Sequence, residues 1–250
     1  MVTALVLLLL WSASSLAAET FLCAGTGYAT DVGGTAKVAA APMRARTGTR
    51  NALIVFARFA DSDAAVRPPD WSSRFFDPDT PGTFSHFYDT MSQSRLRVRG
   101  EVAPRYYRAS RPSADYVGDT GNTSGRYGNL VAEILPQVDR DIDFRRFDND
   151  GADGVPDSGD DDGVVDALFI ILPETPVNFY RGPATGIANL GIGSDYLTND
   201  VGTHSVIRVV PNQGTVQQGR TFAEAVGTVC HEFGHLLGLP DLFDTAFLRA

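Results

Sequence analysis

The sequence predicts an α/β or α+β layer fold. Apolar runs with the length of strands occur at residues 51–59 and 164–172, a third strand candidate lies at 204–210, and other stretches repeat their apolar residues at helical spacing. These strand and helix patterns alternate irregularly, which is typical of a fold built from layers of sheet and helix. The 250 residues, of which 43% are hydrophobic, suffice for one large domain or two small ones with a sizeable core.

The N-terminus has the pattern of an export signal. Residues 1–18 carry no charged side chain and combine an apolar run with small residues at an A-x-A-like cleavage site. This predicts a secretory signal peptide, and hence a secreted, extracellular protein with no stable membrane association after cleavage. A membrane anchor of marginal length is the alternative. Residues 19–49, rich in Ala, Gly and Thr, are interpreted as a linker or pro-segment.

The first half of the predicted domain contains two strands and a helix between them. The run at 51–59 (NALIVFARF) is continuously apolar and predicts a buried strand, whereas 96–102 (LRVRGEV) alternates and predicts a half-exposed strand. Residues 83–92 predict a short helix. Its apolar face carries Phe84, Phe87, Tyr88 and Met91.

The second half contains further elements of both kinds. A helical stripe runs over residues 130–138, and 164–172 (VVDALFIIL) predicts a second buried strand. Residues 174–203 are rich in Gly and Asn and are interpreted as a long loop, and such a loop in a compact domain is usually either functional or a misread segment. A third strand is predicted at 204–210, and the last helix is predicted to begin near Thr221.

The net charge of -9 comes from one segment. Residues 141–166 hold ten Asp and two Arg, while the rest of the chain is nearly neutral. An acidic chain is a poor ligand for nucleic acid, so no nucleic-acid partner is expected. Aspartates separated by glycines favour Ca2+, which takes six to eight oxygen ligands, although no EF-hand is completed and a solvated acidic loop is the alternative. The candidate calcium ligands are Asp148, Asp150, Asp153, Asp157, Asp160, Asp162 and Asp166.

The last helix carries the pattern of a zinc site. Thr221 and Glu224 have the spacing of a capping box, and the motif H-E-x-x-H follows at residues 231–235. Histidines four residues apart lie on one helical face, so His231 and His235 are predicted to bind one Zn2+ ion. Glu232 is predicted to act as the general base that takes a proton from zinc-bound water.

A third ligand is predicted just beyond this helix. Gly238 permits a left-handed turn that ends the helix, Pro240 prevents it from resuming, and Asp241 would then face the metal. The full pattern is H-E-x-x-H-x-x-G-x-x-D. An alternative keeps zinc catalysis but takes the third ligand from a Glu on a later helix.

Residues 231–244 (HEFGHLLGLPDLFD) resemble the active-site stretch of immune inhibitor A-type secreted bacterial metallopeptidases, which are metzincin-like zincins. The acidic segment with its following strand and residues 92–102 (SQSRLRVRGEV) are also similar to that family. The resemblance implies a zincin-like N-terminal subdomain with a twisted mixed sheet and an active-site helix. It also implies zinc ligation by His231, His235 and Asp241, with Glu232 as the base in endopeptidase cleavage of protein or peptide substrates.

The resemblance implies as well that the chain stops before the lower subdomain and its Met-turn, so that 50–250 would be an incomplete catalytic domain. Two hypotheses follow. The first is a secreted zinc endopeptidase, of which the present fragment would be active or inactive. The second is a non-catalytic, calcium-stabilised extracellular binding module with a vestigial zinc helix.

The two cysteines, Cys23 and Cys230, are open to three interpretations: a disulfide, a latency thiolate on zinc, or two unrelated thiols.

Overall fold

The computed structural model describes residues 47–62, 67–118 and 125–239. The predicted signal peptide at 1–18, nearly all of the predicted linker at 19–49, Cys23 and the predicted zinc ligand Asp241 lie outside the described residues.

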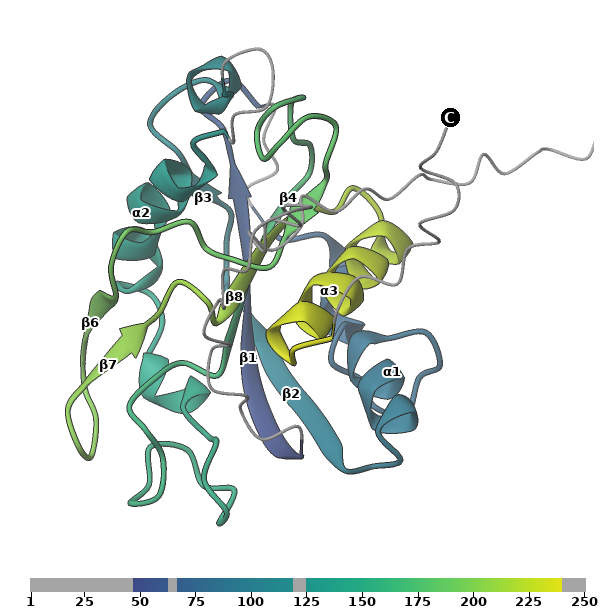
Figure 1. The fold of residues 1–250 in the computed structure, drawn as a ribbon, viewed down its shortest axis with the longest axis vertical. Helices are drawn as coiled ribbons and strands as arrows, with labels where there is room; N and C mark the ends of the chain where they lie inside the picture. The colour runs from purple at the N-terminus through teal and green to yellow at the C-terminus, as the bar shows by residue number, and fades with distance from the viewer. Residues whose placement is uncertain (1–46, 63–66, 119–124, 240–250) are drawn as a thin grey trace, which may run out of the picture.

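The centre of the molecule is a mixed sheet (Figure 1). Its strand order is β2-β1-β4-β8-β5, and β3 also pairs with β1. All pairs are parallel except that of β5 with β8, so β5 is an antiparallel edge strand. The predicted mixed α/β architecture is therefore confirmed. The strands are β1 (Gly48–Arg58), β2 (Leu96–Val102), β3 (Tyr107–Arg108), β4 (Ala167–Leu172), β5 (Gly186–Ile187) and β8 (Gly214–Gln218).

Helices cover both faces of this sheet. On one side lie α1 (Phe84–Met91) and α3 (Phe222–Leu236), and on the other lies α2 (Tyr127–Val138) (Figure 1). Central parallel strands are buried on both faces, which is why β1 and β4 appear in the sequence as unbroken apolar runs. Short 3-10 helices complete the described elements. They are η1 (Asp70–Arg74), η2 (Ser113–Tyr116) and η3 (Phe144–Phe147).

Side-chain alternation along the strands divides the core in two. In β1, Ile54 points to the cluster under α1 and α3, while Leu53 points to the cluster under α2. The predicted stripe of α2 is confirmed, because Leu130, Ile134 and Val138 are all buried. The predicted face of α1 is only half right, since Phe84 and Tyr88 are buried but Phe87 and Met91 are 40% and 68% exposed.

One prediction for the second half was wrong, and one strand was missed. The segment 174–203 is not one loop, because it contributes β5 and also β6 (Tyr196–Val201), which pairs with β7 (Val206–Val209) in a separate two-stranded sheet. The sequence pattern also missed β8. Its residues GTVQQ are mostly polar, although all five are buried between β4, β5 and α3.

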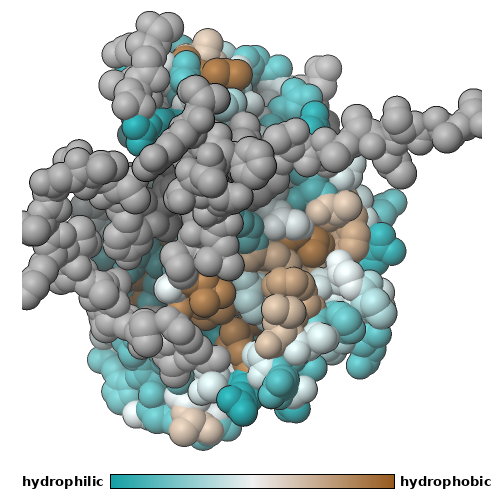
Figure 2. Space-filling model, turned by 45° about the vertical axis from the view of Figure 1, so that its right-hand side comes forward, coloured by the Kyte–Doolittle hydropathy of each residue, from teal (hydrophilic) through white to brown (hydrophobic). Residues whose placement is uncertain are grey.

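The side of the molecule that carries α1 and α3 is partly apolar (Figure 2). Large apolar side chains exposed in this region include Phe87 and Met91 of α1 and Leu239 after α3. A Cβ built on Gly234 of α3 would lie 3.7 Å from Leu239 Cδ1, so Leu239 contacts the helix near its end. Every helix within the described ranges is too short or too polar to cross a lipid bilayer.

Candidate metal centre

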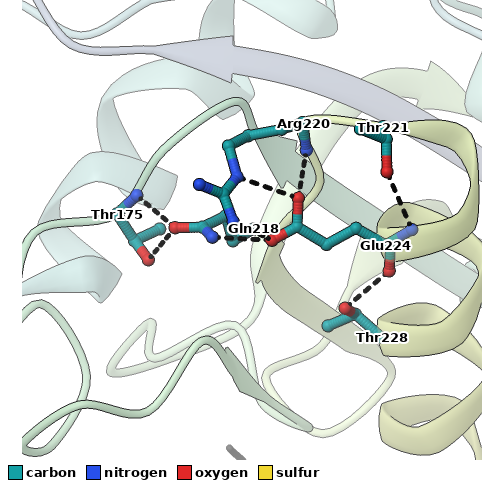
Figure 3. A network of polar contacts seen from close by, with 6 residues as sticks. All are labelled: Thr175, Gln218, Arg220, Thr221, Glu224 and Thr228. Carbon is teal, nitrogen blue, oxygen red and sulfur yellow. Dashed lines mark hydrogen bonds and ion pairs between the residues drawn. The ribbon is translucent and has the colours of Figure 1, made fainter. Parts of the chain in front are cut away.

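The start of α3 is held by the predicted capping residues, with one difference (Figure 3). Glu224 N donates a hydrogen bond to Thr221 Oγ1 at 3.2 Å, as in a capping box. The Glu224 carboxylate, however, accepts from the backbone N–H of Arg220 at 2.8 Å, one residue further upstream than that motif uses. Arg220 Nε adds an ion pair at 3.1 Å. The first turn of the helix is therefore fixed by both side chain and backbone.

Gln218 at the end of β8 connects this helix start to the loop after β4 (Figure 3). Its Nε2 donates to Glu224 Oε1 at 2.7 Å, and its Oε1 accepts from the N and Oγ1 of Thr175 at 2.9 and 3.1 Å. Further along the helix, Thr228 Oγ1 donates to the Glu224 carbonyl oxygen at 2.7 Å. This polar network sets the position in which α3 lies against the sheet.

The two histidines of the motif converge. His231 and His235 lie one turn apart on α3, and their Nε2 atoms are 3.1 Å from each other. Two nitrogens bound to one tetrahedral zinc ion at about 2.0–2.1 Å would be about 3.3 Å apart. Both side chains are half-buried, so solvent reaches them. The pair therefore has the donor type and the spacing that two ligands of one zinc ion require.

The helix ends at the residue that the sequence predicted. Gly238 has a φ of 78°, its N–H donates to the His235 carbonyl oxygen at 2.8 Å, and Leu239 N donates to the Gly234 carbonyl oxygen at 3.0 Å. These two bonds form a Schellman motif, in which a left-handed glycine satisfies the last free carbonyls of a helix. The predicted role of Gly238 as the helix stop is confirmed.

This turn also orients a histidine ring. The Leu239 carbonyl oxygen lies 2.8 Å from His235 Nδ1, and because a carbonyl oxygen only accepts, the Nδ1 carries the proton. The lone pair is then on Nε2, the atom that faces His231. A hydrogen bond on the far nitrogen is the usual device that aims a metal-binding histidine. Asp241 follows two residues later, outside the described residues, so its ligation stays a prediction.

The side chain of Glu232 projects from α3 toward the edge strand β5 of the sheet. Its side chain is fully buried, and a Cβ built on Gly186 of β5 would lie 2.6 Å from its Oε1. Tyr180 is also fully buried. Burial is the main cause that raises the pKa of its phenol, and the nearby charge of Glu232 raises this pKa further. The pattern of the sequence identified Glu232 but neither of these neighbours, because both come from the segment that it described as loop.

Cys230 precedes the first predicted ligand and faces the core. Burial raises the pKa of its thiol to about 12, so the thiolate form is disfavoured. Its main-chain carbonyl oxygen accepts a hydrogen bond from Tyr88 Oη of α1 at 2.5 Å. Since Cys23 lies outside the described residues, the three interpretations of the cysteine pair stay open.

The acidic segment brings three of its seven predicted ligands together. One carboxylate oxygen from each of Asp148, Asp150 and Asp162 lies within 4.8 Å of the others. Oxygens bound to one Ca2+ ion at about 2.3–2.6 Å are separated by up to about 5 Å. Asp148 is 1% exposed, and its Oδ1 has no hydrogen-bond partner among the described residues. Burial, followed by the charges of Asp161, Asp162 and Asp150, raises the pKa of Asp148 to about 6.

The other four predicted calcium ligands are engaged within the fold. Asp153 Oδ1 accepts from Val155 N, and Asp157 Oδ1 accepts from Thr203 N. Asp160 accepts backbone bonds from Ala152 and Asp153, while Asp166 Oδ2 accepts from Asn51 N and Asn149 N.

Sequence reasoning missed two residues that matter in this segment. Asp161 is buried and accepts from Gly151 N and Ser158 N, so it shapes the turn. Arg50 of β1 is also buried, and its Nη1 lies 3.8 Å from Asp150 Oδ2 and 3.7 Å from Asp166 Oδ1. No local spacing could have placed an arginine about a hundred residues away beside these aspartates.

The fold and the histidine-bearing helix define the catalytic domain of a metallopeptidase. A sequence model described as "Immune inhibitor A peptidase M6, catalytic domain" matches residues 72–249. This chain therefore belongs to the immune inhibitor A family of metallopeptidases, and the resemblance identified in its motifs is confirmed.

Curated relatives agree with this assignment. The chain is similar to the pre-pro-metalloprotease PrtV of Vibrio cholerae serotype O1, in strain M66-2 and in strain ATCC 39315 / El Tor Inaba N16961. Each is 28% identical over 181 residues, which cover 64% of this chain. The chain spans only 19% of the length of these relatives.

Proposed function

We propose that this chain is the catalytic part of a secreted, zinc-dependent endopeptidase that hydrolyses peptide bonds of proteins. The observation that carries the proposal is the convergence of His231 Nε2 and His235 Nε2 to 3.1 Å, with the His235 ring aimed by the Leu239 carbonyl. Membership of a metallopeptidase family supports a catalytic metal, and the imidazole donors favour zinc. His231, His235 and Asp241 would hold the ion.

When bound, zinc would supply a Lewis acid that lowers the pKa of a water molecule and polarises the scissile carbonyl. Glu232 would take the proton of the attacking water and later deliver it to the leaving amine. Its burial between α3 and β5 limits the orientations that the carboxylate adopts. The protein or peptide substrate would approach from the solvent-exposed side of the two rings.

The test is a comparison of zinc content and proteolysis. We expect the purified chain to bind one equivalent of zinc and to cleave a denatured protein, and Glu232→Gln to keep the zinc but abolish cleavage. Glu174→Gln, which removes an exposed carboxylate remote from the histidines in the sequence, is the control and should change neither. A Glu232→Gln protein that still cleaves would refute the role of Glu232. Zinc binding with no cleavage by the unaltered chain would favour the second hypothesis, a calcium-stabilised binding module.

We also propose that Asp148, Asp150 and Asp162 bind Ca2+ and that the ion stabilises the fold. Supporting this are the convergence of their oxygens and the buried Asp148 Oδ1 that lacks a partner among the described residues. Like charges this close in a partly buried site repel, and a divalent cation would cancel that repulsion. The ion would lie beside Arg50, at the base of β1.

Export and domain limits complete the proposal. Residues 1–18 would be removed as a signal peptide, residues 19–49 would form a linker or pro-segment, and the catalytic domain would occupy 50–250. N-terminal sequencing of the protein recovered from culture medium tests the first of these, and a start before residue 19 would contradict it.

A further inference from the structure

The wall beside Glu232 contains a polar side chain that the proposed reaction does not use. Gln217 of β8 stands directly opposite Gly186 of β5 in their antiparallel pairing. It is fully buried, and neither its side-chain nitrogen nor its side-chain oxygen has a hydrogen-bond partner among the described residues. A buried amide in that condition is destabilising, so such groups are nearly always found with a partner.

The strand register directs Gln217 toward α3. Its parallel partner on β4 is Ile171, which belongs to the apolar cluster under α3 rather than to the one under α2. Paired residues of adjacent strands project from the same face of the sheet. The side chain of Gln217 therefore enters the layer between the sheet and α3, where Glu232 and Thr228 also lie.

The same register places Gln217 within reach of the Glu232 carboxylate. Directly opposed residues of an antiparallel pair have Cβ atoms about 4.5–5.5 Å apart. A Cβ at Gly186 would be 2.6 Å from Glu232 Oε1 and 3.1 Å from Thr228 Cγ2. Because Gly186 has no side chain, the space in front of Gln217 is occupied by the Glu232 carboxylate instead. The amide and the carboxylate therefore enter the same buried layer, and no direct hydrogen bond joins them in this structure.

We propose that Gln217 is a positioning residue for Glu232. Its amide N–H donates a hydrogen bond to the carboxylate through one bound water and holds the carboxylate toward the histidine pair. A neutral amide suits this task, because it orients a carboxylate without removing the charge that the base needs. Gly186 is the counterpart of Gln217, since any side chain there would displace Glu232. This inference rests on the proposed function only in naming Glu232 as the base.

The first test is independent of peptidase activity. Gln217→Met keeps the length of the side chain and removes both polar atoms. In the full chain with Glu232 present, we expect this substitution to lower the melting temperature, because the carboxylate loses its donor. In a Glu232→Met background, the same substitution should raise the melting temperature, because there the amide is only a buried polar group without a partner. Equal shifts in the two backgrounds would overturn the proposal.

The second test measures turnover in the zinc-loaded chain. We expect Gln217→Met to lower kcat about 10-fold, a fraction of what general base catalysis contributes, while KM and zinc content change less than about twofold. Gln213→Met is the matched control. Gln213 is also a buried glutamine whose Oε1 lacks a partner among the described residues, but it lies about 13 Å further back along the strand direction. The Gln213→Met substitution should leave kcat unchanged.

The outcomes separate the two proposals. An unchanged kcat in Gln217→Met, together with loss of cleavage in Glu232→Gln, refutes the positioning role and leaves the proposed function standing. If Glu232→Gln also cleaves normally, the proposed function fails as well. Opposite melting shifts in the two backgrounds support the contact between Gln217 and Glu232 whatever the turnover shows.

Discussion

Tyr88 Oη donates a hydrogen bond to the main-chain carbonyl oxygen of Cys230, 2.5 Å away, and so joins α1 to the residue directly before His231. The Tyr88 ring packs edge-on against Phe233, with the ring centroids 4.9 Å apart. One tyrosine thus braces the histidine-bearing part of α3 through both a polar and an apolar contact.

Tyr88→Phe keeps the ring packing and removes only this hydrogen bond. We expect the free energy of unfolding to fall by about 0.5–1.5 kcal/mol, the usual contribution of one such bond. Urea denaturation measures the change. Tyr106→Phe is the control, because the Tyr106 ring packs in the same cluster against Phe56 but donates no hydrogen bond to α3 within the described residues. A loss of similar size in both variants would contradict the role of the Tyr88 hydroxyl.

Gly186→Ala should disturb catalysis more than folding. The new Cβ would lie 2.6 Å from Glu232 Oε1, so the carboxylate, at the free end of its side chain, must move. A displaced general base lowers kcat, here by about 10- to 100-fold, while the zinc content stays the same. Gly193→Ala provides the comparison, since a Cβ there has no described atom within 4 Å and should leave turnover intact. Normal turnover in Gly186→Ala would disprove the steric argument.

Substitution by alanine should change the stability of the protein in opposite directions at two glycines, one inside α3 and one just after it. Gly227 is an exposed position inside α3 where a Cβ meets no described atom within 4 Å, so Gly227→Ala should stabilise the protein by about 0.5–1 kcal/mol. Gly238 has a φ of 78°, so Gly238→Ala should destabilise it by about 1–2 kcal/mol. Thermal unfolding of both variants gives the signs, and a stabilising Gly238→Ala would contradict the left-handed helix stop.

Calcium should raise the melting temperature through three aspartates and not through the whole acidic segment. We expect millimolar Ca2+ to stabilise the chain relative to chelator, and Asp148→Asn to remove that response. In chelator, Asp148→Asn should itself be more stable than the parent at neutral pH, because the raised pKa of Asp148 shows that its charge is unfavourable there. Asp153→Asn should keep the calcium response, since Asp153 lies outside the cluster. Identical melting temperatures with and without Ca2+ would refute the site.

The cap of α3 should contribute stability that depends on pH. Burial raises the pKa of Glu224, but hydrogen bonds from Arg220 and Gln218 outweigh it and hold the pKa below its ordinary value. A carboxyl with a lowered folded-state pKa stabilises the fold above its unfolded pKa of about 4.3, and this contribution disappears as the pH falls through the folded value. The stability difference between the parent and Glu224→Gln should therefore shrink below about pH 4.

The matched control for that experiment is Thr221→Ala, at the same helix start. It removes the hydroxyl that accepts from Glu224 N and should lower stability by about 1 kcal/mol with no such pH dependence. Denaturant titrations from pH 3 to pH 7 separate the two. If both differences follow the same pH curve, the Glu224 ion pair is not the cause.

The sequence predicted best what depends on neighbours along the chain. The facing of His231 and His235 and the stop at Gly238 follow from helical periodicity and glycine conformation, which need no knowledge of the rest of the fold. The long apolar runs of β1 and β4 were equally plain, because a central parallel strand is apolar on both faces. In each case the physical cause lies within a few residues of the pattern.

What the sequence could not predict depends on contacts between distant segments. The strand β8 is short and polar, so nothing local marks it as buried, and Gln217 and Gly186 meet only through its register with β5. Aspartate density marked the acidic segment but not which three carboxylates converge, since that depends on the turns at 151–163 and on Arg50. Tyr180 could not be predicted as a neighbour of Glu232 for the same reason, since the two residues lie far apart in the sequence.

The two hydrogen-bonded ends of α3 have a consequence for how this segment tolerates changes in length. Thr221 and Glu224 fix where the helix begins, and Gly238 fixes where it ends. One residue inserted between these ends turns everything beyond it by about 100° about the helix axis. With the insertion before the motif, His231 would take the buried position that Glu232 now holds, and Glu232 would take the place of Phe233 in the apolar cluster, although no residue of the motif had changed. The rotational phase of α3, set about ten residues before the histidines, is as much a part of the active site as the imidazoles themselves.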